Sequence, residues 1–194
     1  TEEKSTKKLD GTLKVVTTGD AYQPLFDKFT EEVGPKVEFI SMSSGEVLSK
    51  LKAEGGTPAA DLWFGGGIDA FMDAKDNNLL EKVDFDAADE LSPDFKDSDN
   101  YWFSKGVTVV GFIVNNDILK EKGLEAPKTW DDLTKEEYQG EVLMSNPAIS
   151  GTNYAVVNAL LQTKGQDEGW KYFEALNKNV DYYSKRGSDP STKT

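Results

Sequence analysis

The sequence contains neither cysteine nor histidine among its 194 residues. Their absence excludes a thiol nucleophile, a zinc site built on these two residue types, and a Ser-His-Asp triad. It also removes the commonest general acid–base side chain, so that an enzyme would have to rely on carboxylates. Because no nucleophile is paired with a base, we predict a binding protein that is not an enzyme and that needs no cofactor.

Positive charge is also scarce, with 22 Lys and Arg residues against 35 Asp and Glu residues and a formal net charge of −13. A surface of this sign makes nucleic acid and anionic membranes poor partners. A local anion site remains compatible with it, because oriented backbone N–H groups need no positive net charge. Long apolar runs are missing as well, and no stretch is suited to span a bilayer.

The chain begins with a polar stretch that has no apolar residue before Leu9. We expect residues 1–10 to form a disordered N-terminal spacer. Two explanations remain open for such a start, a processed exported protein and a chain cut at a chosen residue.

Strands and helices are predicted to alternate three times after this spacer. The expected strands cover residues 13–19, 37–42 and 60–64, and each leads through a short loop into an amphipathic helix. This alternation predicts parallel β-α units with right-handed crossovers. Loops that follow the carboxyl ends of such strands gather at one edge of the sheet, where ligands bind.

Residues 107–114 form an apolar, β-rich run that is longer than a usual strand of about five or six residues. One strand that passes from a first lobe into a second would explain this length, with Gly106 and Gly111 permitting a bend. We therefore expect a first α/β lobe over residues 11–106 and a partial second α/β lobe over residues 107–194. The acidic stretch before the run, residues 83–100, is predicted to be an irregular surface excursion rather than a cation site.

The second half contains further predicted elements. Thr129 is expected to cap a helix, residues 141–144 to form a strand, and residues 191–194 to end the chain without a terminal element. Ser150 follows that strand and a turn, and it is a good N-cap for the apolar helix after it. Either Ser150 only caps this helix, or the free N–H groups after it bind an anion.

Several motifs then occur in a specific order over residues 11–194. The second half contributes three of them: Thr129-Trp130-Asp131-Asp132-Leu133, Tyr138-Gln139-Gly140-Glu141-Val142, and Asn146-Pro147 followed by Ser150-Gly151-Thr152. In this order, and after the β-α start, the chain closely resembles the extracytoplasmic solute-binding proteins of ABC importers. The cluster it resembles includes receptors for ferric iron, phosphonates and sugar phosphates.

The resemblance implies a two-lobed periplasmic-binding-protein-like α/β fold that closes on a solute held between the lobes. It implies delivery of a small anionic or metal solute to a membrane permease, at an extracytoplasmic location. A lipid on a cysteine just before Thr1 would be the only contact with the membrane. An effector-sensing domain of a transcription regulator shares this architecture and is the alternative.

Two departures from the family qualify these expectations. Family members are considerably longer, so the chain looks truncated within the second lobe. The paired tyrosines that hold iron in ferric receptors lie beyond the last residue of this chain, and Tyr182-Tyr183 does not stand at their position. The metal ligands are therefore unknown, and iron and a phosphorylated compound both remain candidate solutes.

The resemblance places ligand-binding residues on loops of both lobes. They are Thr18, Gly19, Tyr22, Ser44, Gly45, Trp63, Gly65, Gly66, Ser150, Gly151, Thr152 and Arg186. Trp63 and Tyr22 either contact the ligand or pack in the core. Arg186 either binds an anion or is an ordinary surface arginine. Asp20 and Glu46 have oxygen ligands for a hard cation, although we expect Asp20 to cap the following helix.

Overall fold

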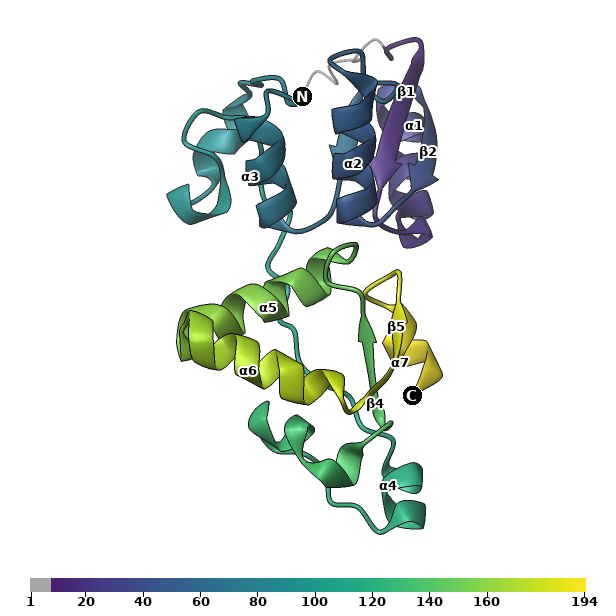
Figure 1. Cartoon of the computed structure of the whole chain (residues 1–194). Coiled ribbons are helices and arrows are strands. Elements are labelled where there is room, and N and C mark those ends of the chain that lie inside the picture. The colour runs from purple at the N-terminus through teal and green to yellow at the C-terminus, as the bar shows by residue number, and fades with distance from the viewer. Residues whose placement is uncertain (1–7) are drawn as a thin grey trace. The chain divides into compact units, whose positions relative to one another are not determined.

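The computed structural model describes residues 8–194, and the chain divides into two compact units (Figure 1). Unit 1 ends at Lys105 and unit 2 begins at Gly106. Residues 1–7 of the predicted spacer lie outside the described residues. Within the rest of that stretch, the backbone N–H of Leu9 donates to the carbonyl of Val33 at 2.8 Å.

Unit 1 is built on a three-stranded parallel sheet with the strand order β2-β1-β3. The central strand β1 (Thr12–Thr17) pairs with β2 (Lys36–Ser41) on one side and β3 (Leu62–Phe64) on the other. Helices α1 (Gln23–Val33), α2 (Ser44–Glu54) and α3 (Ile68–Asp76) follow these strands in turn. The predicted parallel β-α alternation is therefore confirmed.

The two faces of this sheet are covered by different helices. On one face, Val16 packs with Val47 and Leu51 of α2 in a buried apolar cluster. On the other face, the ring of Phe26 from α1 lies 5.1 Å from the ring of Phe39 and 5.7 Å from that of Phe64, measured between centroids. Because side chains alternate along a strand, the run of β-branched residues in β1 can face both helices.

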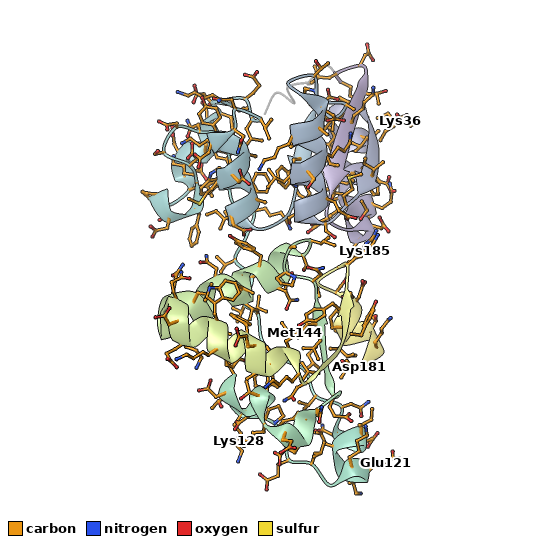
Figure 2. All side chains as sticks on the ribbon, in the orientation of Figure 1. Lys36, Glu121, Lys128, Met144, Asp181 and Lys185 are labelled. Carbon is orange, nitrogen blue, oxygen red and sulfur yellow. The ribbon has the colours of Figure 1, made fainter. Side chains whose placement is uncertain are left out.

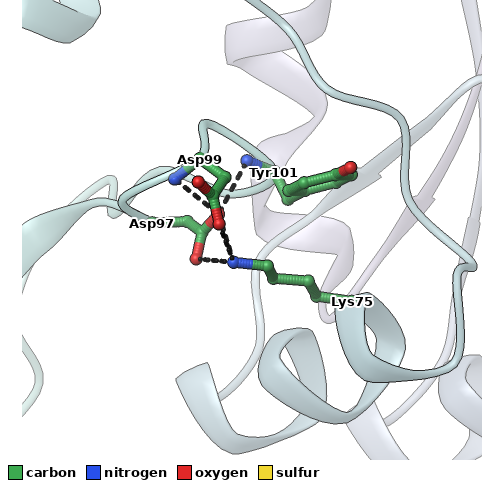
Figure 3. Close-up of polar contacts among 4 residues, drawn as sticks. All are labelled: Lys75, Asp97, Asp99 and Tyr101. Atoms are coloured by element: carbon green, nitrogen blue, oxygen red, sulfur yellow. Dashed lines mark hydrogen bonds and ion pairs between the residues drawn. The ribbon is translucent and has the colours of Figure 1, made fainter.

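The acidic stretch after α3 contains only two short 3₁₀ helices, η2 (Asp86–Glu90) and η3 (Pro93–Phe95). It is nevertheless fastened to the unit. The Nζ atom of Lys75 on α3 donates to both carboxylate oxygens of Asp97, at 2.8 and 2.9 Å, and to Asp99 at 2.8 Å (Figure 3). Asp97 is only 7% exposed and also accepts from the backbone N–H groups of Asp99 and Tyr101.

Unit 2 contains two parallel strands, β4 (Val142–Ser145) and β5 (Val180–Ser184). Two longer helices, α5 (Gly151–Lys164) and α6 (Gln166–Asn177), connect them and lie together beside the strands (Figure 1). Short helices complete the unit: α4 (Asn116–Lys122), η4 (Asp131–Thr134), η5 (Glu136–Tyr138) and α7 (Asp189–Lys193).

The core of unit 2 lies between α5, α6 and η4. It consists of five buried side chains, Leu133, Val156, Leu160, Tyr172 and Leu176. Met144 of β4, labelled in Figure 2, packs against this cluster. Charged side chains such as Lys36 and Glu121 are exposed on the outside of their own units.

The prediction of a long strand over residues 107–114 was wrong, because this run forms no strand. Val107, Val109 and Ile113 are 73%, 91% and 69% exposed. A strand needs a neighbour for its backbone groups, and among residues 8–194 none pairs with this run. A cavity of about 360 Å³ in unit 2 borders it, with Val110, Phe112, Leu119 and Met144 among its walls.

Two further predictions about local structure were wrong. The helix expected after Thr129 is only a 3₁₀ turn, although the Asp132 carboxylate accepts from the backbone N–H groups of Lys128 and Thr129, both at 2.9 Å. Thr129 still accepts from the N–H of Asp132, at 3.2 Å. The chain also ends in a helix, α7, which Pro190 favours because its fixed φ angle suits a first turn.

Candidate functional site

The N-terminus of α5 is the best-defined candidate site in unit 2. Ser150 is the N-cap residue, as predicted, but its side chain makes no capping hydrogen bond. Ser150 is only 3% exposed, and its Oγ atom has no hydrogen-bond partner among residues 8–194. A buried hydroxyl left unpaired costs roughly 1–3 kcal/mol. Such a group in a native fold needs an explanation, and this makes Ser150 a candidate binding residue.

The backbone groups beside Ser150 are also free to bind a ligand. Within residues 8–194 no acceptor meets the N–H groups of Gly151, Thr152 or Asn153, and the first bond of the helix is that of Tyr154 to the Ser150 carbonyl. The first turn of α5 contains no acidic residue, whereas that of α6 contains Asp167 and Glu168. The positive end of the α5 dipole is therefore not neutralised locally.

The loop after β5 lies against this helix start. The Oγ atoms of Ser145 and Ser184 donate to the carbonyl of Arg186, at 2.9 and 3.0 Å, and the Arg186 N–H donates to Asp189 at 3.1 Å. These bonds fix the backbone of the loop and place Gly187 beside Thr152. A Cβ atom on Gly187 would be 3.3 Å from Ser150 Oγ. Gly187 was not among the predicted site residues, although its neighbour Arg186 was.

The side chain of Arg186 itself is exposed, and it forms no ion pair with any other residue in the described range 8–194. The structure brings its backbone, rather than its guanidinium group, to the start of α5. Binding of a ligand by Arg186 stays a prediction.

In unit 1, several predicted residues converge on Gly65, which follows β3. A Cβ atom on Gly65 would lie 2.7 Å from Thr18 Oγ1 and 3.7 Å from Tyr22 Oη. Gly65 has a φ of 93°, which a residue with a side chain rarely adopts. A third polar group reaches the same place: the Nζ atom of Lys105 donates to Tyr22 Oη at 2.6 Å. Lys105 was not predicted, because its position, 83 residues after Tyr22, carries no sequence signal.

Polar groups at the start of α2 form hydrogen bonds within unit 1. Ser43 and Glu46 form a capping box, in which the Ser43 N–H donates to the Glu46 carboxylate at 3.0 Å. Ser44 is buried, and its Oγ atom accepts from the Gly67 N–H at 3.3 Å. Gly66 lies close by, since a Cβ there would be 2.7 Å from Ser44 Oγ. Gly45 stands in the first turn of the helix.

The remaining predicted residues of unit 1 have different structural roles. Trp63 stacks on Phe71 with ring centroids 4.1 Å apart and packs against the buried cluster of Val16, so its ligand role stays a prediction. Gly19 is the N-cap of the 3₁₀ helix η1 (Asp20–Tyr22). The expectation that Asp20 caps the following helix was wrong, because α1 has no side-chain cap. In residues 8–194, no group of three Asp or Glu side chains is arranged to hold a metal ion.

Comparison with known proteins identifies the class to which this fold and these loops belong. Residues 58–189 match the family described as bacterial extracellular solute-binding protein. The chain belongs to this family, and the resemblance found in the sequence is confirmed. Among residues 8–194, no helix combines the length and apolar character needed to cross a bilayer.

Particular relatives are similar over much of the chain. An uncharacterised protein of Haemophilus influenzae is 34% identical over 84% of this chain and 49% of its own length. The phosphoglycerate transport regulatory protein PgtC of Salmonella typhimurium is 39% identical over 43% of this chain and 21% of its own. The periplasmic binding protein AfuA of Actinobacillus pleuropneumoniae, solved with fructose-6-phosphate bound, superimposes with a TM-score of 0.89 at 30% identity, over 94% of this chain and 60% of that one.

These similarities confirm the predicted fold class, an α/β fold of the periplasmic-binding-protein type. The chain spans about half the length, or less, of the curated relatives it matches.

Proposed function

We propose that the protein is the solute-binding receptor of an ABC importer and that the start of α5 binds the phosphoryl group of a small phosphorylated solute. The observation that carries the proposal is the unpaired hydroxyl of Ser150, which is 97% buried beside a helix N-terminus. Together with the N–H groups of Gly151, Thr152 and Asn153, it provides a set of donors and no acceptor charge. Such a set suits a tetrahedral anion.

The steric arrangement supports the same choice of ligand. Gly187 has no side chain at the point where Thr152 and Ser150 approach it, so the backbone of the loop comes close to both hydroxyl groups. The exposed hydroxyl of Thr152 extends this donor set toward solvent. The cavity in unit 2 is lined mainly by apolar residues, but Thr152, Asn153 and Gly187 line it as well, so the start of α5 supplies hydrogen-bond donors at that cavity.

The relatives support a phosphorylated solute as well. AfuA was solved with a sugar phosphate, and the name of PgtC refers to a phosphoglycerate. These two proteins are 30% and 39% identical to this chain over their matched regions. Other curated relatives are named for iron and for 2-aminoethylphosphonate, at 27% identity each, and we therefore keep both solutes in the test.

The family assignment also supports the cellular setting. An extracytoplasmic receptor delivers its solute to a membrane permease, and one relative is named as a probable ABC transporter periplasmic-binding protein. Lipid anchoring stays a prediction. The alternative of an effector-sensing domain is less well supported, because the matching family is described as extracellular.

Calorimetric titration of the full-length protein tests this function. The ligands are fructose 6-phosphate, 3-phosphoglycerate, 2-aminoethylphosphonate, ferric citrate and, as a neutral reference, fructose. We expect binding of a phosphorylated compound and none of fructose. Hydrogen bonds to charged groups contribute roughly 1.5–3 kcal/mol each, so Ser150→Ala and Thr152→Ala should each weaken that binding about tenfold or more.

A matched control and a stability measurement separate binding from folding. Thr163→Ala lies near the other end of α5, where its hydroxyl bonds back to Ala159, and it should leave affinity unchanged. Without ligand, Ser150→Ala should unfold no more easily than the wild type, because it removes an unpaired hydroxyl. Binding of ferric citrate alone, or unchanged affinity in both site variants, would refute the phosphoryl site.

A further inference from the structure

Lys105 extends its ammonium group over the candidate residues of unit 1. Its Nζ atom lies 4.5 Å from the centre of the Tyr22 ring and 5.5 Å from that of Phe64, and it donates to Tyr22 Oη at 2.6 Å. A Cβ atom on Gly65 would lie 3.6 Å from the Lys105 Cε atom. The ammonium group, two hydroxyl groups and a glycine without a side chain therefore meet at the carboxyl edge of the sheet.

The position of Lys105 is fixed by the segment before it. The Lys75–Asp97 ion pair fastens that segment to α3 (Figure 3), and the backbone N–H of Ser104 donates to the carbonyl of Phe95 at 2.7 Å. The ring of Phe103 packs edge-on against that of Phe85, with centroids 4.7 Å apart. The chain thus presents Lys105 at a defined place rather than on a free tail.

The charges around Lys105 suggest a ligand. No Asp or Glu of residues 8–194 forms an ion pair with it, although the chain carries 35 acidic residues against 22 basic ones. Lys105 is exposed, and Thr18 and Tyr22 are half-buried beside it. The three side chains offer an ammonium group and two hydroxyl groups, and they approach Gly65 closely because this residue has no side chain. Anionic oxygen atoms are the groups that such donors bind most strongly.

We propose that Lys105 is a specificity-determining residue that binds an anionic oxygen group of the solute, so that unit 1 selects by charge. This inference rests on the proposed function as a solute receptor. The anionic group is a carboxylate or a phosphoryl group, and Tyr22 and Thr18 add hydroxyl donors to it. The rival role is structural: the ammonium group over two rings would stabilise unit 1 and touch no solute.

A pair of related solutes separates these roles. 3-Phosphoglycerate and glycerol 3-phosphate share a phosphoryl group but differ in a carboxylate, and both are titrated calorimetrically into the full-length protein at low and high ionic strength. Lys105→Met keeps an apolar side chain on the Tyr22 and Phe64 rings and removes the charge. Lys105→Arg keeps the charge. Lys36→Met removes one positive charge at the other end of the strands, where Lys36 pairs with Glu38.

We expect Lys105→Met to weaken binding about tenfold or more and to reduce its dependence on salt. A loss confined to 3-phosphoglycerate assigns the carboxylate to Lys105, and a loss for both solutes assigns the phosphoryl group. Lys105→Arg should recover most of the affinity, and Lys36→Met should retain all of it.

Two different results would overturn the proposal. If the wild type binds a phosphorylated solute and Lys105→Met binds it equally well, Lys105 has only a structural role and the proposed function stands. If the wild type binds no phosphorylated compound, fructose 6-phosphate included, the proposed function fails and this inference fails with it.

Discussion

A Cβ atom added to Gly187 would lie 2.4 Å from the Oγ1 atom and 2.8 Å from the Cβ atom of Thr152. Atoms cannot approach so closely, so these two residues lie together only because position 187 has no side chain. Gly187→Ala should therefore push the β5–α7 loop away from the start of α5. We expect a loss of about 1–3 kcal/mol in the free energy of unfolding, typical of overpacking, measured by equilibrium urea unfolding. Affinity for a phosphorylated solute should fall as well.

Gly111→Ala is the matched control for this substitution, because a Cβ atom there would have no neighbour within 4 Å. It should change the free energy of unfolding by less than about 0.5 kcal/mol. Equal effects of the two substitutions would show that the contact between Gly187 and Thr152 is not tight in solution.

Asp97 gives a prediction that depends on pH. Burial is the largest single influence on its carboxyl and acts to raise the pKa, but the hydrogen bonds from Lys75, Tyr101 and Asp99 together outweigh it and lower the pKa. A lowered pKa means that the ionised carboxylate stabilises the folded state. Asp97→Asn should therefore be less stable than the wild type by roughly 1–3 kcal/mol at neutral pH in urea unfolding.

The difference in the free energy of unfolding between Asp97→Asn and the wild type should have its full size above the pKa of an unfolded Asp, about 4. It should shrink as the pH falls through the lower pKa of the folded state, because protonated Asp97 is then as neutral as asparagine. Asp99→Asn serves as the control, since Asp99 is exposed and such pairs contribute little. A difference that stays constant down to acid pH would contradict the role of the Asp97 charge.

Much of unit 1 could be predicted from the sequence, because its strands carry enough local information. The run that contains Val15 and Val16 is buried on both faces, and this favours β-branched residues without interruption. The start of α2 also depends on local residues, because Ser43 and Glu46 form a capping box and stand three residues apart.

The failures concern features that depend on distant residues. Residues 107–114 have the composition of a strand, but composition cannot supply the neighbouring strand that pairing requires. Ser150 was expected to bond to its own helix, whereas the structure leaves its hydroxyl unpaired beside the Arg186–Gly187 loop. Lys105 reaches Tyr22 through a tertiary contact between residues 83 positions apart, and the Lys75–Asp97 ion pair helps to hold the segment that leads to Lys105.

Tyr172 provides a second prediction that depends on pH, at the alkaline end. Burial, with a smaller contribution from the Asp131 carboxylate, raises the pKa of Tyr172 to about 12. An unfolded tyrosine has a pKa of about 10, so the neutral phenol stabilises the folded state below pH 10 and this contribution is lost as the pH rises toward 12. The hydroxyl group also donates to the Trp130 carbonyl at 2.8 Å.

Tyr172→Phe should lower the free energy of unfolding by about 0.5–1.5 kcal/mol at neutral pH, because it removes this hydrogen bond. The difference from the wild type should become smaller above pH 10, where only the wild type has a phenol to ionise. Tyr154→Phe, at an exposed position on α5, should have little effect at any pH. Urea unfolding across this pH range measures both variants, and a difference that does not change with pH would contradict the prediction.

Asn179 holds the η4–η5 turn to the start of β5, and its loss should loosen the core of unit 2. This side chain is 3% exposed, and its Nδ2 atom donates to the carbonyls of Leu133 and Lys135, at 2.8 and 2.7 Å. Asn179→Ala leaves two carbonyls unpaired and should cost roughly 1–3 kcal/mol in urea unfolding. Asn179→Asp should cost more, because a carboxylate has no donor and faces both carbonyl oxygens. Asn158→Ala, which loses one exposed contact to Gln162, should cost only about 0.2–0.5 kcal/mol. An Asn179→Asp variant as stable as Asn179→Ala would show that the turn moves away and that these two bonds do not fix it.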